Sequence, residues 1–324
     1  MRRAKKKKSV LNGLAGPGFV AGIALLALLI STASHAKTLS PAGSSASNNS
    51  LPVTGNRAML FEETAFHEPA QDLSYGPFPD QVLDWYPPLH RTQDPAPVIV
   101  FAHGGGFVMG DEAIDTEKDP WNALLEQGYA IASIRYRLSS TAVFPEQPKD
   151  LGKAIQFIRA HAHAFNADPE RITAYGISAG GTLVSYVAFG PDLQVINSPI
   201  ARERFSSRPN SAIIQNGATD WRIYDSKIPG VYFGTATLAD VSQTTLEQAS
   251  AVWHIENSAP PIPTLALYTT NISSAPLTNI HDAFNGLHLH KSLNARNTLV
   301  PHAFYARTST PLAPLIADWL EEIE

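Results

Sequence analysis

The stretch that most constrains the fold runs from Arg171 to Leu183 and reads RITAYGISAGGTL. Its first part, Ile172–Tyr175, has the composition of a short buried strand. Glycines stand two residues before and two residues after Ser178, and the residues that follow are compatible with a helix. A serine held in a strained, positive-φ turn brings those two flanking positions so close together that a Cβ on either would clash. The stretch therefore predicts a strand, a very sharp turn at Ser178 and a helix.

Such a turn would make Ser178 a nucleophile. It lifts the hydroxyl group out of the sheet edge and points the first N–H groups of the helix, including that of Ala179, at an oxyanion formed beside the serine. The five-residue pattern GISAG is short, and a chain with 21 glycines can contain it by chance. A second motif is needed to support this interpretation.

The second motif is HGGGF, His103–Phe107, which directly follows the apolar run Val98–Phe101. Glycines at these positions let backbone N–H groups come close to a substrate oxygen. We therefore expect Gly104 and Gly105 to complete an oxyanion hole with Ala179. Two such motifs, each after a predicted strand, argue against coincidence.

The two motifs together resemble the α/β-hydrolase superfamily, and specifically its carboxylesterase branch, which includes enzymes similar to hormone-sensitive lipase and to feruloyl esterases. Intervening stretches are similar to that branch in the same order, namely IRYRLS, FPEQPKD and ADPERI. The resemblance is good over residues 75–189 and loose over the remainder. It implies an α/β-hydrolase fold and hydrolysis of carboxylic esters through an acyl-enzyme.

Alternating apolar runs and helical patterns agree with this fold class. They predict a mostly parallel sheet with helices on both faces. The expected strands are Gln81–Tyr86 (at an edge), Val98–Phe101, Ala130–Tyr136, Ile172–Tyr175, Ala212–Gln215, Thr264–Tyr268 and one near Leu299–Tyr305; the expected helices are Trp121–Gln127, Lys149–His163, the one after Ser178 and Leu312–Glu322.

Two segments, Gly190–Asn210 and Ile223–Val252, have no clear place in that sheet. In this architecture we expect such insertions to lie over the C-terminal ends of the strands and to shape the substrate site. The second one has a helical pattern around Leu238–Ala251. Four aromatic residues are candidate pocket walls or, equally, ordinary core: Trp221, Tyr224, Tyr232 and Phe233.

The acid of the expected Ser–acid–His triad does not match the family pattern. The resemblance implies a carboxylate after the strand Thr264–Tyr268, but the sequence there has none. Asp282 is the nearest later carboxylate and is the candidate, although it could equally cap a helix. Asp220, just past the preceding strand, is a second option, for which we favour the interpretation of a structural turn residue.

The histidine of the triad is also displaced. The resemblance implies a histidine after the last strand, where the sequence reads ARTST. His302 lies a few residues earlier and is our candidate base, with His281 beside Asp282 as the alternative. Other histidines fit the role less well: His103 belongs to the glycine loop, His254 is expected to be packed, and His288 and His290 fall on a predicted helix.

The mismatch leaves two hypotheses about function. In the favoured one, a displaced acid and base still reach Ser178 and the protein hydrolyses a small-molecule ester or an acylated carbohydrate. In the other, the triad is broken and the protein is a pseudoenzyme that binds such a ligand without turning it over.

The N-terminus predicts export. Four lysines, Lys5–Lys8, precede the apolar run Phe19–Ile30 and a small-residue stretch that ends at Ala36, which is the order of a secretory signal peptide. An uncleaved membrane anchor is the alternative, and only then do we expect contact with a membrane. Residues 37–56 are expected to form a flexible linker and residues 57–324 the hydrolase domain, in a periplasmic or secreted protein.

Composition excludes several other functions. The net charge of −5 and the absence of a basic cluster outside the export signal argue against nucleic-acid binding. A chain with no cysteine has neither disulfides nor a thiol nucleophile. No metal-ligand motif, phosphate-binding loop or dinucleotide fingerprint occurs, so no metal site and no cofactor are expected.

Overall fold

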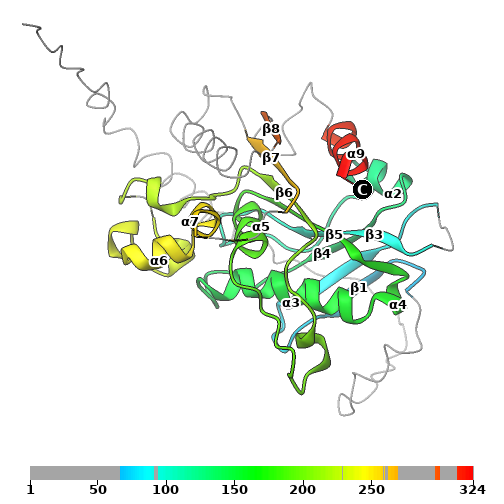
Figure 1. Cartoon of the computed structure of the whole chain (residues 1–324), viewed down its shortest axis with the longest axis horizontal. Helices are drawn as coiled ribbons and strands as arrows, with labels where there is room; N and C mark the ends of the chain where they lie inside the picture. Colours follow the sequence, from blue (N-terminus) through cyan, green and yellow to red (C-terminus); the bar gives the residue numbers. More distant parts are fainter. Residues whose placement is uncertain are drawn as a thin grey trace, which may run out of the picture.

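The strands form one sheet in the order β1-β2-β4-β3-β5-β6-β7-β8 (Figure 1). The computed structural model describes residues 66–90, 94–227, 229–257, 259, 262–268, 296–299 and 312–323. The predicted signal peptide and linker lie outside the described residues. The strands are β1 (Ala70–Ser74), β2 (Val82–Tyr86), β3 (Ala96–Ala102), β4 (Ala130–Ile134), β5 (Ala167–Ile177), β6 (Ser211–Gln215), β7 (Thr264–Tyr268) and β8 (Arg296–Leu299).

The sheet is mostly parallel, as predicted. The β1–β2 and β2–β4 pairs are antiparallel, whereas the pairs from β4 through β3, β5, β6 and β7 to β8 are parallel. The prediction that Gln81–Tyr86 forms an edge strand is wrong. Strand β2 pairs with β4 on one side and with β1 on the other, so β1 is the edge strand. The five residues of β1, AQDLS, are polar enough that they gave no strand signal.

Helices cover both faces of the sheet (Figure 1). Alternate residues of β3 point to opposite faces: Val98 and Val100 pack on the side of α3 and α5, while Ile99 and Phe101 pack on the side of α2 and α9. The helices are α2 (Trp121–Glu126), α3 (Glu146–Ala160), α4 (Ala162–Phe165), α5 (Ala179–Phe189), α6 (Gln243–Gln248), α7 (Ala251–Glu256) and α9 (Leu312–Ile323), and the 3-10 turns are η2 (Ala201–Arg204), η3 (Trp221–Ile223), η4 (Val231–Phe233) and η5 (Leu238–Asp240).

Most element boundaries fall within a few residues of the prediction. The helix expected over Lys149–His163 begins earlier, at Glu146, because Pro148 is tolerated in a first helical turn. The last strand, expected near Leu299–Tyr305, occupies Arg296–Leu299, and residues 300–311 lie outside the described part.

The prediction for the first insertion is wrong. Residues 190–210 do not lie over the C-terminal strand ends but run along α3 towards the start of β6. The guanidinium group of Arg159, at the far end of α3, donates to the carbonyl oxygens of Ser206 and Arg208 and to the Asn210 side chain. These contacts fix the segment on the helix layer, away from Ser178.

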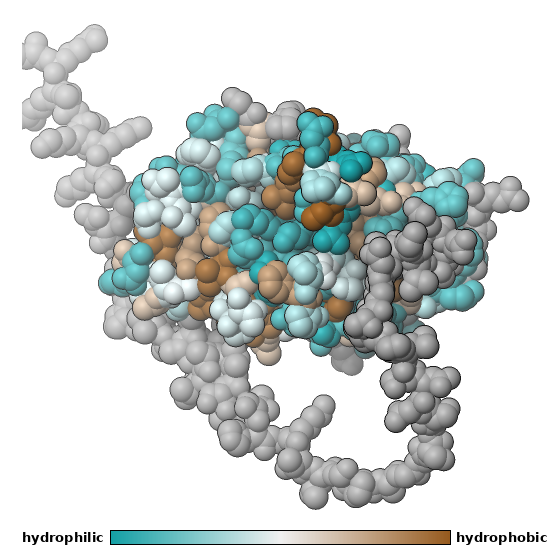
Figure 2. Space-filling view, turned by 90° about the horizontal axis from the view of Figure 1, so that it is seen from below, coloured by the Kyte–Doolittle hydropathy of each residue, from teal (hydrophilic) through white to brown (hydrophobic). Residues whose placement is uncertain are grey.

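The same segment carries exposed apolar side chains, at Val195, Ile196, Ile200 and Phe205. Figure 2 views the molecule from the side where this segment protrudes in Figure 1, and it shows hydrophobic residues standing among hydrophilic ones. Among the described residues, no helix is long and apolar enough to cross a membrane.

Candidate active site

Ser178 occupies the strained turn that its sequence context predicts. It lies between the end of β5 and the start of α5 and has φ 53° and ψ −116°. The N–H group of Ser178 donates to the carbonyl oxygen of Gln215 on β6 at 2.7 Å, and its own carbonyl oxygen accepts from Thr182 of α5. These two hydrogen bonds hold the backbone of Ser178 in a conformation that costs on the order of 1–3 kcal/mol for a residue other than glycine.

The glycines around Ser178 are required by close backbone contacts. A Cβ on Gly176 would lie 2.2 Å from the carbonyl oxygen of Gly180, as the spacing predicts. A Cβ on Gly180 would lie 2.0 Å from the carbonyl oxygen of Ala102, at the end of β3. The turn therefore packs closely against the end of β3, and its two flanking glycines pack closely against each other.

The HGGGF motif follows β3 and lies beside Ser178. The Cβ position of Gly104 is 3.5 Å from the Cβ atom of Ser178. We call residues 104–107 the oxyanion loop; its last three residues all have positive φ angles, 116° at Gly105, 61° at Gly106 and 65° at Phe107. The N–H groups of Gly104, Gly105 and Ala179 donate no hydrogen bond to another described residue, so they are available for an oxyanion.

The side chain of His103 supports the oxyanion loop through contacts with Tyr136 and Gly104. Its ring is 7 % exposed and stacks on Tyr136 at 4.3 Å between centroids, and the Tyr136 hydroxyl donates to the His103 carbonyl oxygen. Nδ1 lies 2.6 Å from the carbonyl oxygen of Gly104, and because that oxygen can only accept, Nδ1 carries the proton. Burial lowers the pKa of His103, which keeps the ring neutral.

Asp220 is held by an arginine, which supports the structural interpretation of this residue. Its carboxylate accepts from Nε and Nη2 of Arg222 at 2.7 and 2.8 Å and from the Arg222 backbone N–H. Arg222 also pairs with Glu256 on α7. Asp220 thus caps η3, and Arg222 links η3 to α7.

His254 is packed, as expected. Its Nε2 atom lies 2.7 Å from the carbonyl oxygen of Gln248, and its ring meets Tyr186 edge-on. The remaining triad candidates, Asp282, His302, His281, His288 and His290, lie outside the described residues. They stay predictions.

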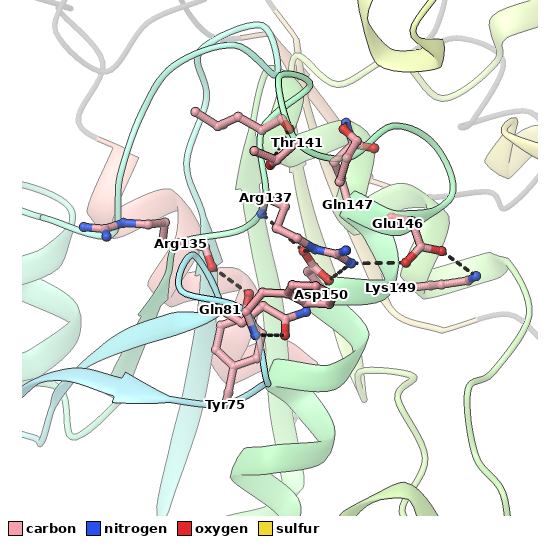
Figure 3. Close-up of polar contacts among 12 residues, drawn as sticks. Tyr75, Gln81, Arg135, Arg137, Thr141, Glu146, Gln147, Lys149 and Asp150 are labelled. Atoms are coloured by element: carbon pink, nitrogen blue, oxygen red, sulfur yellow. Dashed lines mark hydrogen bonds and ion pairs between the residues drawn. The ribbon is translucent and has the colours of Figure 1, made fainter. Parts of the chain in front are cut away.

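An ionic cluster with a buried centre lies where the connection between β4 and α3 meets α3 (Figure 3). Arg137 and Asp150 form a two-pronged ion pair, with Nε–Oδ2 and Nη2–Oδ1 distances of 2.8 and 2.7 Å. The Gln81 amide donates to Asp150, and Glu146 joins Arg137 to Lys149. The cluster fastens the connection between β4 and α3 to α3, and α3 to Gln81 just before β2. Its position was not expected from the sequence.

The four candidate pocket aromatics belong to a larger group. We define the aromatic cluster as Phe107, Phe144, Trp221, Tyr224, Tyr232 and Phe233, whose neighbouring rings lie 4.4–5.8 Å apart between centroids. Trp221 and Tyr232 are buried, whereas Tyr224 and Phe233 are partly buried. The cluster joins the second insertion to the oxyanion loop, so this insertion does lie over the C-terminal strand ends.

Within the described residues, no group of three or more His, Cys, Asp or Glu side chains is placed to hold a metal ion.

The BD-FAE family model matches residues 83–266, which is more than half of the chain and includes both glycine motifs. The chain belongs to the BD-FAE family. This is a family of esterases with the α/β-hydrolase fold, and the resemblance of the two motifs is thereby confirmed.

Two curated relatives of this BD-FAE protein come from Mycobacterium tuberculosis. Esterase LipI is 36 % identical over 105 residues, which are 32 % of each chain. The probable carboxylic ester hydrolase LipM is 28 % identical over 218 residues, 64 % of this chain and 48 % of LipM. The matched part thus spans between about a third and a half of the length of these relatives.

Solved structures show the same fold. An acetyl ester-xyloside bifunctional hydrolase from Caldicellulosiruptor lactoaceticus has a TM-score of 0.58 at 22 % identity, covering 76 % of this BD-FAE chain and 89 % of that chain. Esterase 2 of Thermogutta terrifontis, in a structure phosphoramylated by tabun, has a TM-score of 0.57 at 25 % identity. The match covers 79 % of this BD-FAE chain and 92 % of that chain.

Proposed function

We propose that this BD-FAE protein is an exported serine hydrolase that cleaves carboxylic esters through an acyl-enzyme on Ser178. The observation that carries the proposal is the strained turn at Ser178, φ 53°, which lies against Gly104 of the oxyanion loop. A strained serine turn beside backbone N–H groups that have no partner among the described residues serves acyl transfer and gives little to a protein that only binds.

In the proposed mechanism, the Ser178 oxygen attacks the ester carbonyl and passes its proton to a histidine. The oxyanion accepts hydrogen bonds from the N–H groups of Ala179 and of Gly104 or Gly105. The tetrahedral intermediate collapses to the acyl-enzyme, and the protonated histidine gives its proton to the departing alcohol. Water, deprotonated by the same histidine, then releases the carboxylic acid and restores Ser178.

For the histidine and its acid we keep the pair His302 and Asp282, with His281 as the alternative base. Asp220 is the weaker alternative acid, since its carboxylate already pairs with Arg222. A histidine that lacks its carboxylate loses its correct tautomer and orientation, which lowers turnover by several powers of ten in the serine proteases.

The proposed substrates are esters of short acyl groups, including acylated carbohydrates. Support comes from the activities of structurally similar proteins. They include the acetyl ester-xyloside hydrolase and a truncated carbohydrate esterase from gut microbiota, which has a TM-score of 0.59 and 17 % identity. Acetyl or feruloyl groups on plant polysaccharides would suit an exported enzyme of this kind.

Hydrolysis of p-nitrophenyl acetate by the protein lacking residues 1–36 tests the catalytic proposal. We expect turnover that falls by at least about 1,000-fold in Ser178→Ala, since the variant keeps the oxyanion hole but has no nucleophile. Ser185→Ala, on the buried side of α5, is the matched control and should keep most of the activity. Equal turnover by Ser178→Ala and the unmodified protein would contradict the proposal.

Export rests on the N-terminal pattern and is tested separately. The full chain is expressed in a Gram-negative host, the cells are fractionated, and the N-terminus of the recovered protein is sequenced. We expect periplasmic protein that begins at Lys37. Protein that remains in the cytoplasm with its first residues intact would contradict export and would leave the chemistry of Ser178 unaffected.

A further inference from the structure

Phe107 is the residue through which the oxyanion loop meets the second insertion. It has φ 65°, a conformation that is uncommon for a bulky residue, and it is nevertheless buried. Its ring stacks on Tyr232 of η4, with centroids 4.4 Å apart and planes 24° from parallel. A strained conformation of this kind persists only where surrounding contacts compensate for it.

The connection between β4 and α3 joins the same two residues through the backbone. The N–H group of Ser139 donates to the Phe107 carbonyl oxygen, and the N–H group of Phe144 donates to the Tyr232 carbonyl oxygen, both at 2.8 Å. The rings of Phe144 and Tyr232 also meet, at 5.4 Å between centroids. Tyr232 is thus braced against the connection that the Arg137–Asp150 pair holds to α3.

The ring of Tyr232, rather than its hydroxyl group, makes these contacts. Tyr232 is 2 % exposed, and its oxygen has no hydrogen-bond partner among the described residues. A buried hydroxyl without a partner destabilises the fold. Stacking of its ring, in contrast, stabilises the fold beyond burial alone and offsets part of the strain at Phe107.

We propose that Tyr232 is a positioning residue for ester hydrolysis, which holds Phe107 and thereby fixes the oxyanion loop beside Ser178. The proposal rests on the proposed function of Ser178 and adds to it a role for the second insertion. Oxyanion donors act only when they lie within about 2.7–3.1 Å of the developing charge. Without the ring of Tyr232, Phe107 can relax towards negative φ, which turns the peptide groups of the loop away from the oxyanion.

The test compares three variants in p-nitrophenyl acetate hydrolysis. Tyr232→Phe keeps the ring and Tyr232→Leu removes it. Phe165→Leu removes a buried ring outside the aromatic cluster, since Phe165 packs on Phe66, Trp85 and Phe157. We expect Tyr232→Phe and Phe165→Leu to keep kcat within about threefold. Tyr232→Leu should lower kcat by about 10- to 100-fold with little change in KM, since a fully lost donor costs about 100- to 1,000-fold.

Hydrogen–deuterium exchange of the peptide that contains residues 103–110 gives a readout independent of turnover. Exchange should speed up in Tyr232→Leu and stay unchanged in the other two variants. Where Tyr232→Leu does not fold, Tyr232→Met serves in its place, because methionine fills the volume with a flexible chain. Far-ultraviolet circular dichroism verifies the fold of each variant.

Two results would overturn the proposal: unchanged kcat and loop exchange in Tyr232→Leu, or an equal loss of kcat in Tyr232→Phe, which would assign the effect to the hydroxyl group. If turnover proves independent of Ser178, the proposed function fails, and loop exchange still decides whether Tyr232 holds the loop.

Discussion

At the residue scale, the strain at Ser178 is maintained by its neighbours. Gly176 and Gly180 approach each other as the GISAG spacing predicts, because that contact is local and depends only on the turn. The contact of Gly180 with the Ala102 carbonyl oxygen could not be predicted, since it joins two strands that are far apart in the sequence. The stacking of His103 on Tyr136 was missed for the same reason.

Gly180→Ala should damage the turn severely. Its added Cβ would lie 2.0 Å from a backbone oxygen that cannot move without shifting β3. Gly128→Ala is the control, because Gly128 has φ 93° but no atom within 4 Å of the added Cβ. We expect Gly128→Ala to lower the unfolding free energy by about 1 kcal/mol and Gly180→Ala by more than about 3 kcal/mol in urea titrations. Similar losses of unfolding free energy in both variants would show that the close approach of Gly180 to the Ala102 carbonyl oxygen does not limit stability.

The neutral state of His103 predicts a pH dependence of stability. Burial lowers its pKa in the folded protein, so below about pH 6.5 the unfolded chain takes up a proton that the folded protein does not, and stability falls as the pH falls. His103→Asn removes this loss along with the stacking on Tyr136. The stability difference between the unmodified protein and His103→Asn should therefore shrink from pH 7.5 to pH 5 in urea titrations. A difference that stays constant with pH would show that folding does not lower the pKa of His103.

At the element scale, the chain places two motif-bearing connections at the C-terminal ends of adjacent parallel strands, β3 and β5. The strands and helices between residues 96 and 189 were predicted well because their apolar patterns are strong. Strand β1 was missed because AQDLS lacks such a pattern, and β2 was assigned to the edge as a consequence. The ionic cluster that fastens the β4–α3 connection was missed because its members Gln81, Arg137 and Asp150 are distant in sequence.

Breaking that cluster should destabilise the protein without removing an active-site group. Asp150 is fully buried, and Asp150→Asn removes the buried charged partner of the Arg137 guanidinium and leaves it only the partly exposed Glu146. The expected loss of unfolding free energy is about 3–5 kcal/mol. Lys149→Met removes the partly exposed pair with Glu146 and should cost less than about 1 kcal/mol. Both free energies are measured by urea unfolding. Comparable losses in the two variants would show that the buried pair contributes no more to stability than a surface pair.

At the scale of the whole molecule, the two insertions have different roles. The segment over residues 190–210 packs along α3, and the sequence could not reveal this because the contacts of Arg159 are with backbone carbonyl groups, which leave no mark on residue type. The second insertion reaches the oxyanion loop through Tyr232, although the sequence left its aromatic residues open as pocket walls or ordinary core. The strained turn at Ser178 and its flanking glycines were predicted from local sterics. The acid and the histidine depart from the family pattern, and they stay predictions, as does the catalytic role of Ser178.

The domain boundary predicts how truncation affects stability. Phe66 donates its N–H to the Ala164 carbonyl oxygen and stacks on Phe165, so folded contacts are present from residue 66 onwards. Removing residues 1–56 should leave the thermal midpoint unchanged. Removing residues 1–66 should lower it by several degrees, since a loss of about 1–2 kcal/mol shifts the midpoint of a domain of this size by a few degrees. A large shift on removal of the first 56 residues would contradict the predicted linker.

The most direct test of the account is the reaction of the folded protein with paraoxon, followed by mass spectrometry of the intact chain and of its peptides. Similar structures of esterase 2 from Thermogutta terrifontis are phosphorylated by paraoxon and phosphoramylated by tabun. We predict one phosphoryl adduct, on the peptide that contains Ser178, with no adduct in Ser178→Ala. A folded protein that forms no adduct, or one that is modified elsewhere while Ser178 stays free, would contradict the assignment of Ser178 as an activated nucleophile.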